Sequence, residues 1–241
     1  MARLWIAGFA LLALVGAGSL VYVTRPPTAA GPRQVAVTEM EHAHGLAVDP
    51  SNPQVVWIGT HGSLIRAIGG KQWDRIGPQT YDMMGFTVHP TEANILLTSG
   101  HPGQNDRRPN PLGVEISRDG GQTWQPLGLT GLADFHVMTV SRADSKVLWA
   151  WNVSGRRGLY RSKDGGRQWE YLGEPLGGAF YLAAHSQRAN VVFAGTGRGL
   201  AISENAGGSW QLFGSSLSGV PVTAVEVHPK NPQIIYAYAE T

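Results

Sequence analysis

One arrangement of apolar and polar positions recurs five times along this 241-residue chain. Each copy begins with an alternating apolar stretch, passes through a turn rich in Pro and polar residues, and ends in a second apolar stretch. The first copy reads HGLAVDPSNPQVVWIGTH (44–61), and the last reads TAVEVHPKNPQIIYAYAE (223–240). Short apolar runs bounded by turn signals predict β-strands. The pattern therefore predicts an all-β protein built from repeated strand pairs.

A second motif follows these strand pairs and ends in tryptophan. It reads SRDGGQTW (117–124), SKDGGRQW (162–169) and SENAGGSW (203–210), and a shortened copy ends in IGGKQW (68–73). The four tryptophans stand 51, 45 and 41 residues apart. This spacing is the length of a four-stranded propeller blade.

The motif resembles the Asp-box, or BNR repeat, of sialidases, sortilin-type receptors and related exported propellers that are described as glycosyl-hydrolase-like. The resemblance implies an all-β fold, a β-propeller of four-stranded Asp-box blades with four blades plus a half blade visible. The half blade stops at Thr241 before its own box, so we expect the chain to be truncated. The box is structural in that family, which agrees with an Asp that accepts backbone N–H bonds and a Gly with positive φ. The structural role falls on Ser117, Asp119, Gly121, Trp124, Ser162, Asp164, Gly166, Trp169, Ser203, Asn205, Gly207 and Trp210.

Composition narrows the classes of function. The net charge is +2 and no Lys/Arg run exceeds two residues, so no basic stripe is available to neutralise nucleic-acid phosphates. The chain has no cysteine, which excludes disulfides, thiolate metal sites and a cysteine nucleophile.

The N-terminus predicts export. An uncharged apolar run covers residues 4–23 between Arg3 and Arg25, and a helix of that length spans about 30 Å, the thickness of a bilayer core. Residues 1–23 are therefore a signal peptide or a transmembrane anchor, residues 24–39 a linker, and residues 40–241 the propeller. Both alternatives predict an extracytoplasmic location.

The eight histidines fall into two groups when the repeats are aligned. His89, His185 and His228 share a turn position with Asp49, so we interpret them as turn residues. The other five start the first strand or end the second strand of a unit, and we expect these ends to share the mouth of the central channel. Antiparallel pairing should bring His44 near His61 and Met84 near His101. The candidate ligand or metal set is His42, His44, His61, Met84, His101 and His136.

Imidazole suits Zn, Cu, Fe and Ni, and a thioether without thiolates favours copper. Cu or Zn is therefore the candidate metal, with Asp82 and Asp134 as carboxylates that orient the imidazoles. Two alternatives remain, namely a metal-free ligand site on the same face and histidines that only line the channel.

Two other classes of function stay open. Asp82 and Asp134 share one position on neighbouring blades, so they are the candidate acids of a glycoside hydrolase, with Asp106 in the long loop 102–111 as a further carboxylate. The sialidase motif is not found, since its nearest match is DRIGP (74–78). The chain also resembles photosystem II stability/assembly factors, which dock on membrane proteins through arginines, and blade three gathers Arg156, Arg157, Arg161 and Arg167. The partner is then a carbohydrate or a membrane protein.

Overall fold

A computed structural model describes residues 35–36 and 42–240. The predicted signal or anchor segment 1–23 and most of the linker 24–39 lie outside these residues. Within the described part, one 3-10 helix is present, Ser215–Leu217 (η1), and no helix is long and apolar enough to cross a membrane. All other regular structure in this part is β-strand, as the sequence predicts.

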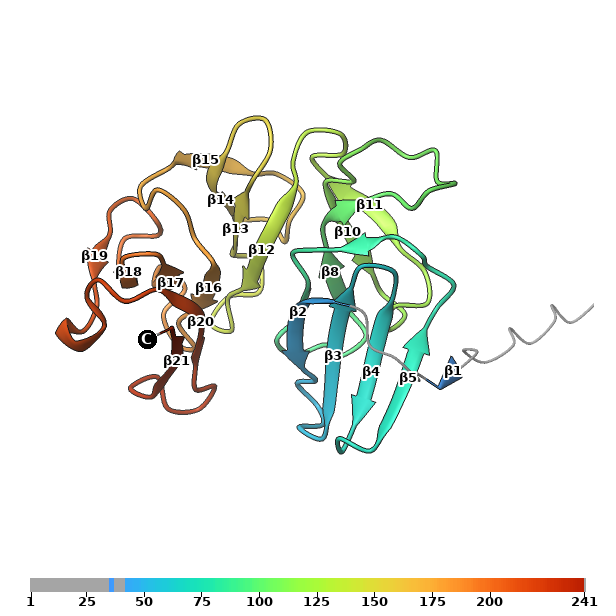
Figure 1. The fold of residues 1–241 in the computed structure, drawn as a ribbon, viewed down its shortest axis with the longest axis horizontal. Helices are drawn as coiled ribbons and strands as arrows, with labels where there is room; N and C mark the ends of the chain where they lie inside the picture. Colours follow the sequence, from blue (N-terminus) through green and yellow to red (C-terminus); the bar gives the residue numbers. More distant parts are fainter. Residues whose placement is uncertain (1–34, 37–41, 241) are drawn as a thin grey trace, which may run out of the picture. The chain divides into compact units, whose positions relative to one another are not determined.

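The strands form four consecutive antiparallel sheets, each with the four strands of a propeller blade in order, and a two-stranded sheet follows them (Figure 1). This arrangement confirms the predicted all-β propeller with four blades and a half blade. The first blade contains β2 (Ala43–Val48), β3 (Val55–Thr60), β4 (Leu64–Ile68) and β5 (Gln72–Ile76), and β1 (Val35–Ala36) pairs with β5 at its outer edge. The second contains β7 (Thr87–Val88), β8 (Leu96–Thr98), β10 (Val114–Ser117) and β11 (Gln125–Gly128), with the short pair β6 (Asp82–Met83) and β9 (Gly100–His101) beside it. The third contains β12 (Phe135–Val140), β13 (Leu148–Asn152), β14 (Gly158–Ser162) and β15 (Glu170–Gly173). The fourth contains β16 (Tyr181–Ala184), β17 (Val192–Thr196), β18 (Gly199–Ser203) and β19 (Gln211–Leu212), and the half blade contains β20 (Val222–Val227) and β21 (Ile235–Ala239).

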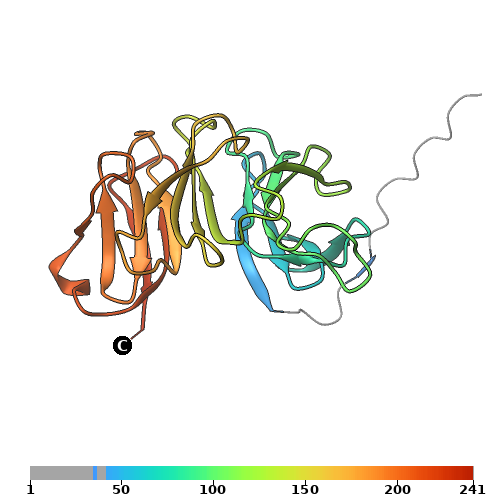
Figure 2. The same ribbon diagram turned by 90° about the horizontal axis from the view of Figure 1, so that it is seen from above.

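The inner strands of successive blades contact one another, from β2 through β7, β12 and β16 to β20 (Figure 2). Apolar side chains fill the space between neighbouring blades. Trp149 of blade three, for example, is fully buried in a cluster with Leu182 and Val192 of blade four. Burial of this apolar surface holds consecutive blades together and fixes the position of each inner-strand end.

The Asp-box forms the same hydrogen-bonded turn in blades two, three and four. In blade two, Asp119 Oδ1 accepts the Ser117 hydroxyl at 2.8 Å and the Thr123 N–H at 2.9 Å. Gly121 has φ +85° and donates its N–H to Ser117 Oγ, and Trp124 Nε1 donates to the Gly121 carbonyl. Blades three and four repeat these bonds, with the amide oxygen of Asn205 in place of the carboxylate.

At the turn position that Asp49 occupies in blade one, the three turn histidines accept the same backbone hydrogen bonds as the aspartate. Asp49 Oδ1 accepts the N–H groups of the residues two and three positions later. His185 Nδ1 accepts the equivalent two N–H groups at 3.1 Å each, and His89 and His228 do the same. A neutral imidazole nitrogen and a carboxylate oxygen are both acceptors, which explains why the two residue types share this position.

The start of the inner strand carries a β-bulge, which the aligned sequence does not reveal. The register shifts around His44 in blade one, around His136 in blade three and around Thr223 in the half blade. A bulge bends the strand and turns the extra side chain away from the regular alternation. In blades one and three and in the half blade, the bulge therefore turns the side chain at this position away from its regular direction.

Candidate functional site

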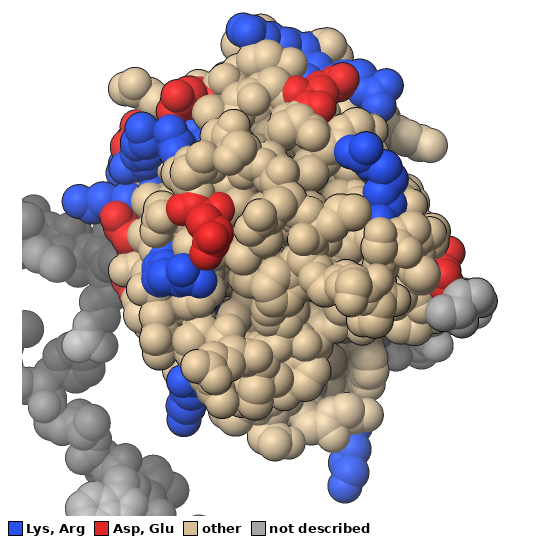
Figure 3. Space-filling model, turned by 90° about the vertical axis from the view of Figure 1, so that its left-hand side faces the viewer, with Lys and Arg blue, Asp and Glu red and all other residues tan. Residues whose placement is uncertain are grey.

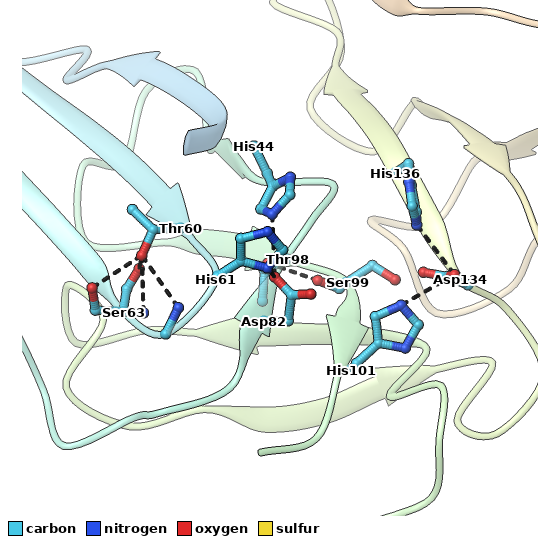
Figure 4. A network of polar contacts seen from close by, with 11 residues as sticks. His44, Thr60, His61, Ser63, Asp82, Thr98, Ser99, His101, Asp134 and His136 are labelled. Atoms are coloured by element: carbon cyan, nitrogen blue, oxygen red, sulfur yellow. Dashed lines mark hydrogen bonds and ion pairs between the residues drawn. The ribbon is translucent and has the colours of Figure 1, made fainter. Parts of the chain in front are cut away.

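Three histidines and one aspartate meet where blade one adjoins the pair β6 and β9. We call His42, His44, His61 and Asp82 the first His cluster. The His44 and His61 rings lie 4.2 Å apart between centroids, and the His42 ring lies 4.8 Å from that of His44. His44 and His61 point toward Asp82 (Figure 4), with His44 Nε2 at 3.3 Å and His61 Nδ1 at 3.0 Å from its Oδ1. The expected proximity of His44 and His61 is present.

The contact between His44 and Asp82 at the centre of this cluster is buried, and within the described structure it is not a hydrogen bond. His44 Nε2 and Asp82 Oδ1 are both shielded from solvent, and neither takes part in a hydrogen bond among the described residues. Buried polar atoms are normally hydrogen-bonded, and an exception indicates a proton, a water or an ion between the groups. His42 and His61 remain exposed, so the cluster opens to solvent on one side.

The electrostatic surroundings favour a neutral His44. Burial lowers the pKa of His44, against the raising effect of the Asp82 carboxylate, and positive charge on His61, His42 or His136 would lower the pKa further. Neutral imidazole is the form that binds a metal ion.

Asp134, His101 and His136 form what we call the second His cluster. Asp134 Oδ2 lies 3.3 Å from His101 Nε2 and 3.2 Å from His136 Nε2 (Figure 4). The other carboxylate oxygen, Oδ1, is buried and has no hydrogen-bond partner in the described structure. The remaining ring nitrogen of His101, Nδ1, lies 2.9 Å from the side-chain oxygen of Asn110.

Backbone contacts hold both clusters in place. The N–H of Asp134 donates to the Asn152 side chain at 2.7 Å, and its carbonyl accepts the Val153 N–H. Gly100 has φ +141°, and a Cβ there would stand 2.0 Å from the Asp82 carbonyl oxygen. Only glycine lets β6 and β9 approach this closely.

The register of β6 and β9 places Asp82 directly opposite His101. Met84, which we expected near His101, is buried, and its N–H donates to the Ser99 carbonyl. The proximity of the Met84 thioether to His101, and with it the argument for copper, stays a prediction.

The structure also bears on the two proposed catalytic acids. Asp82 and Asp134 each face two imidazoles, and Asp134 is only 4% exposed. A general acid or base of a glycosidase must come within hydrogen-bond reach of the sugar. This geometry makes the two carboxylates better partners for imidazoles than for a sugar.

The long loop 102–111 contributes a residue that the sequence interpretation missed. Asp106, the further carboxylate of the glycoside-hydrolase alternative, pairs with Arg108, and Arg108 also pairs with the fully buried Glu115. The residue that contacts a cluster is Asn110, next to His101. The only feature of the sequence that could have indicated this contact is the position of Asn110, nine residues after His101.

The arginines of blade three have partners within the protein. Arg156 stacks on Tyr171 at 3.9 Å, and Arg161 pairs with Glu170 at 2.8 Å. Arg157 lies 3.9 Å from Glu174, and Arg167 donates to the Asp164 carbonyl. On the face drawn in Figure 3, lysine and arginine side chains are scattered and form no single patch.

Comparison with known proteins gives a fold and no family. No protein-family model matches the sequence, and no curated protein matches it. Solved structures do match: the GH74 xyloglucanase from Xanthomonas campestris at TM-score 0.57 and 16% identity, over 82% of this chain and 35% of that enzyme. YCF48 bound to D1 peptide matches at TM-score 0.54 and 15% identity, over 87% of this chain and 65% of that protein. A chain of a nidogen/laminin complex matches at TM-score 0.62 and 16% identity, over 83% of this chain and 72% of that chain.

These likenesses establish similarity to propeller folds. At 15–16% identity they carry no activity from one protein to another. The chain also spans only about a third of the GH74 xyloglucanase to which it is similar.

Proposed function

We propose that this protein is an extracytoplasmic propeller that binds a transition metal ion, Zn²⁺ or Cu²⁺, through the first His cluster. The observation that carries the proposal is the buried Asp82 Oδ1, which makes no hydrogen bond to any described residue and lies 3.0 and 3.3 Å from two imidazole nitrogens. One ligand atom from each of His42, His44 and His61 also lies within 4.8 Å of the others.

The spacing supports a tetrahedral site. Four ligands at the usual 2.0–2.1 Å from Zn²⁺ stand about 3.3–3.4 Å apart. The two distances from Asp82 to His44 and His61 are close to that edge, so an ion between the three groups would need little rearrangement. His42 is exposed and completes the set from the solvent side.

The donor atoms favour borderline metals. Imidazole nitrogen with one carboxylate oxygen suits Zn²⁺ and Cu²⁺, and the chain has no cysteine that would favour Cu⁺ or a thiolate site. The open side next to His42 and His61 would leave a coordination position for water or for a small ligand.

Protein binding is a second candidate function. Two structural neighbours are complexes, YCF48 with D1 peptide and nidogen with laminin. This chain exposes Tyr236 and Tyr238 on β21, by 57% and 65%, and exposed aromatic side chains are common in protein interfaces. The arginines of blade three support it less, because they already have internal partners. Cross-linking of wild type and the Tyr236→Ser/Tyr238→Ser variant in the native membrane fraction would test it, and equal cross-linking would reject a role of these tyrosines.

Elemental analysis tests metal binding directly. The full chain is purified without a histidine tag, offered Zn²⁺ or Cu²⁺, and freed of excess metal before measurement. We expect bound metal in the wild type and its loss from this cluster in the His44→Ala/His61→Ala variant.

The matched control is His89→Asp/His228→Asp, which removes two imidazoles but keeps a turn acceptor of the kind that Asp49 provides. The control should retain the metal. Absence of bound metal in the wild type, or equal binding by the His44→Ala/His61→Ala variant, would reject the proposal.

A further inference from the structure

The second His cluster has a hydrogen-bonding conflict of its own. His101 Nδ1 faces the Asn110 oxygen at 2.9 Å, so this nitrogen carries a proton and donates it. In a neutral imidazole the other nitrogen, Nε2, then presents a lone pair. That lone pair points at Asp134 Oδ2, which is also an acceptor, at 3.3 Å. Two acceptors face each other unless a proton or a metal cation lies between them.

The neighbouring atoms favour a cation that several groups share. His136 Nε2 approaches the same oxygen at 3.2 Å, and the ligand atoms of His101, Asp134 and His136 lie within 4.8 Å of one another. The Asp134 side chain is 94% buried, and its second carboxylate oxygen is shielded from solvent and has no hydrogen-bond partner in the described part of the chain. A buried carboxylate with an unsatisfied oxygen gains from a bound cation more than an exposed one would.

The two distances again match the edge of a tetrahedral site. They are 3.2 and 3.3 Å, against about 3.3–3.4 Å for ligands of Zn²⁺. Asn110 holds the outer nitrogen of His101, which is the usual role of a group behind a metal-binding imidazole. The second cluster thus has two imidazoles, one carboxylate and a supporting amide.

From these contacts we infer that the second His cluster binds a second divalent transition-metal ion, next to the one in the first cluster. The inference rests on the proposed function, since it treats the two clusters as a pair of sites. The pair is fixed by the backbone, because Asp82 of the first cluster and His101 of the second are directly opposite in the ladder of β6 and β9. Each cluster contains one carboxylate between two imidazole nitrogens, so both sites offer similar ligands.

Stoichiometry tests the inference. The full chain is titrated with Zn²⁺ in a calorimeter, and the bound metal is measured after removal of the excess. We expect two equivalents for the wild type, one for His44→Ala/His61→Ala and one for His101→Ala/His136→Ala. Co²⁺ replaces Zn²⁺ as a second probe, and its visible absorption should fall by about half in each variant.

The possible results separate the two proposals. One equivalent in the wild type that disappears only in the first-cluster variant overturns the second site and leaves the proposed function standing. One equivalent that disappears in either variant shows a single shared site and overturns the inference. No binding at all overturns both. His101→Gln/His136→Gln, with side chains that keep a polar end, replaces the alanine variant if the latter does not fold.

Discussion

Asp82 and His101 are directly opposite in the antiparallel ladder of β6 and β9, yet their side chains belong to different clusters. Asp82 faces His44 and His61, whereas His101 faces Asp134. Cβ atoms of opposed residues in such a ladder are about 4.5–5.5 Å apart. A short strand pair in blade two therefore supplies one ligand to each candidate site and fixes their separation.

The Gly100→Ala substitution should disturb both clusters at once. Its Cβ would stand 2.0 Å from the Asp82 carbonyl oxygen at φ +141°, so β6 and β9 must move apart. We expect a loss of about 2 kcal/mol or more in the free energy of unfolding, because both strain and the clash contribute. Bound metal should decrease as well, measured by elemental analysis, and stability by chemical denaturation.

Gly173→Ala is the matched control, because Gly173 has φ +90° but no atom of the described residues would lie within 4 Å of the added Cβ. The loss of unfolding free energy in this control measures the cost of placing alanine at a positive φ without the clash. If Gly100→Ala loses no more stability than Gly173→Ala and keeps its metal, the close approach of β6 and β9 does not matter for the site.

Asp82→Asn should weaken metal binding without unfolding the protein. The amide keeps the shape of the carboxylate but removes the charge that lies 3.0 and 3.3 Å from His61 and His44. Loss of a carboxylate that only supports metal-binding imidazoles costs about 10–100-fold in metal affinity, and loss of Asp82, a proposed ligand, should cost at least as much. Competition with a chromophoric chelator measures the change, and Asp144→Asn, in an exposed turn, is the control. Unchanged affinity would remove Asp82 from the site.

The sequence was sufficient to predict the fold because the fold depends on local patterns. Glycine, aspartate and tryptophan at fixed spacing specify a hairpin that needs no distant residue, as the identical turns around Asp119 and Asp164 show. Blade length follows from the distances between these turns. The structure therefore confirms the blades and their order.

The site was predicted only in part, because its details depend on departures from regular strands. Alignment of the repeats placed His44 beside His61 correctly. It could not show the bulge at His44 and His136, or that Asp82 lies directly opposite His101. Asn110 was missed for a different reason, since the path of the long loop depends on Arg108 and its pairing with a buried glutamate.

The Asp-box turns allow a graded test of their hydrogen bonds. Asp164 Oδ1 accepts the N–H groups of Arg167 and Gln168 at 3.0 and 2.9 Å. Asp164→Ala leaves these groups without their acceptor, and we expect a loss of about 1.5–3 kcal/mol in the free energy of unfolding. Asp164→Asn should cost clearly less, because Asn205 makes the equivalent bonds in blade four. Equal losses for the two variants would show that charge, and not the acceptor, stabilises the turn.

His185 should make the stability of the protein depend on pH. Burial and the nearby charge of Arg188 lower the pKa of His185 below its usual value of 6.5. In the unfolded chain the pKa returns to about 6.5, so on acidification the unfolded state binds the proton first. The contribution of His185 to stability is therefore present above about pH 6.5 and is lost as the pH falls below that value, until the folded-state pKa is reached.

His185→Asp isolates this contribution. Aspartate accepts two backbone N–H groups at the same turn position in blade one, as Asp49 does, and it stays ionised from pH 7.5 down to 5.5. Denaturation at these two pH values should show a smaller loss of unfolding free energy on acidification for the variant than for the wild type. Parallel losses would mean that protonation of His185 is not coupled to unfolding, in spite of the two N–H groups that its Nδ1 accepts.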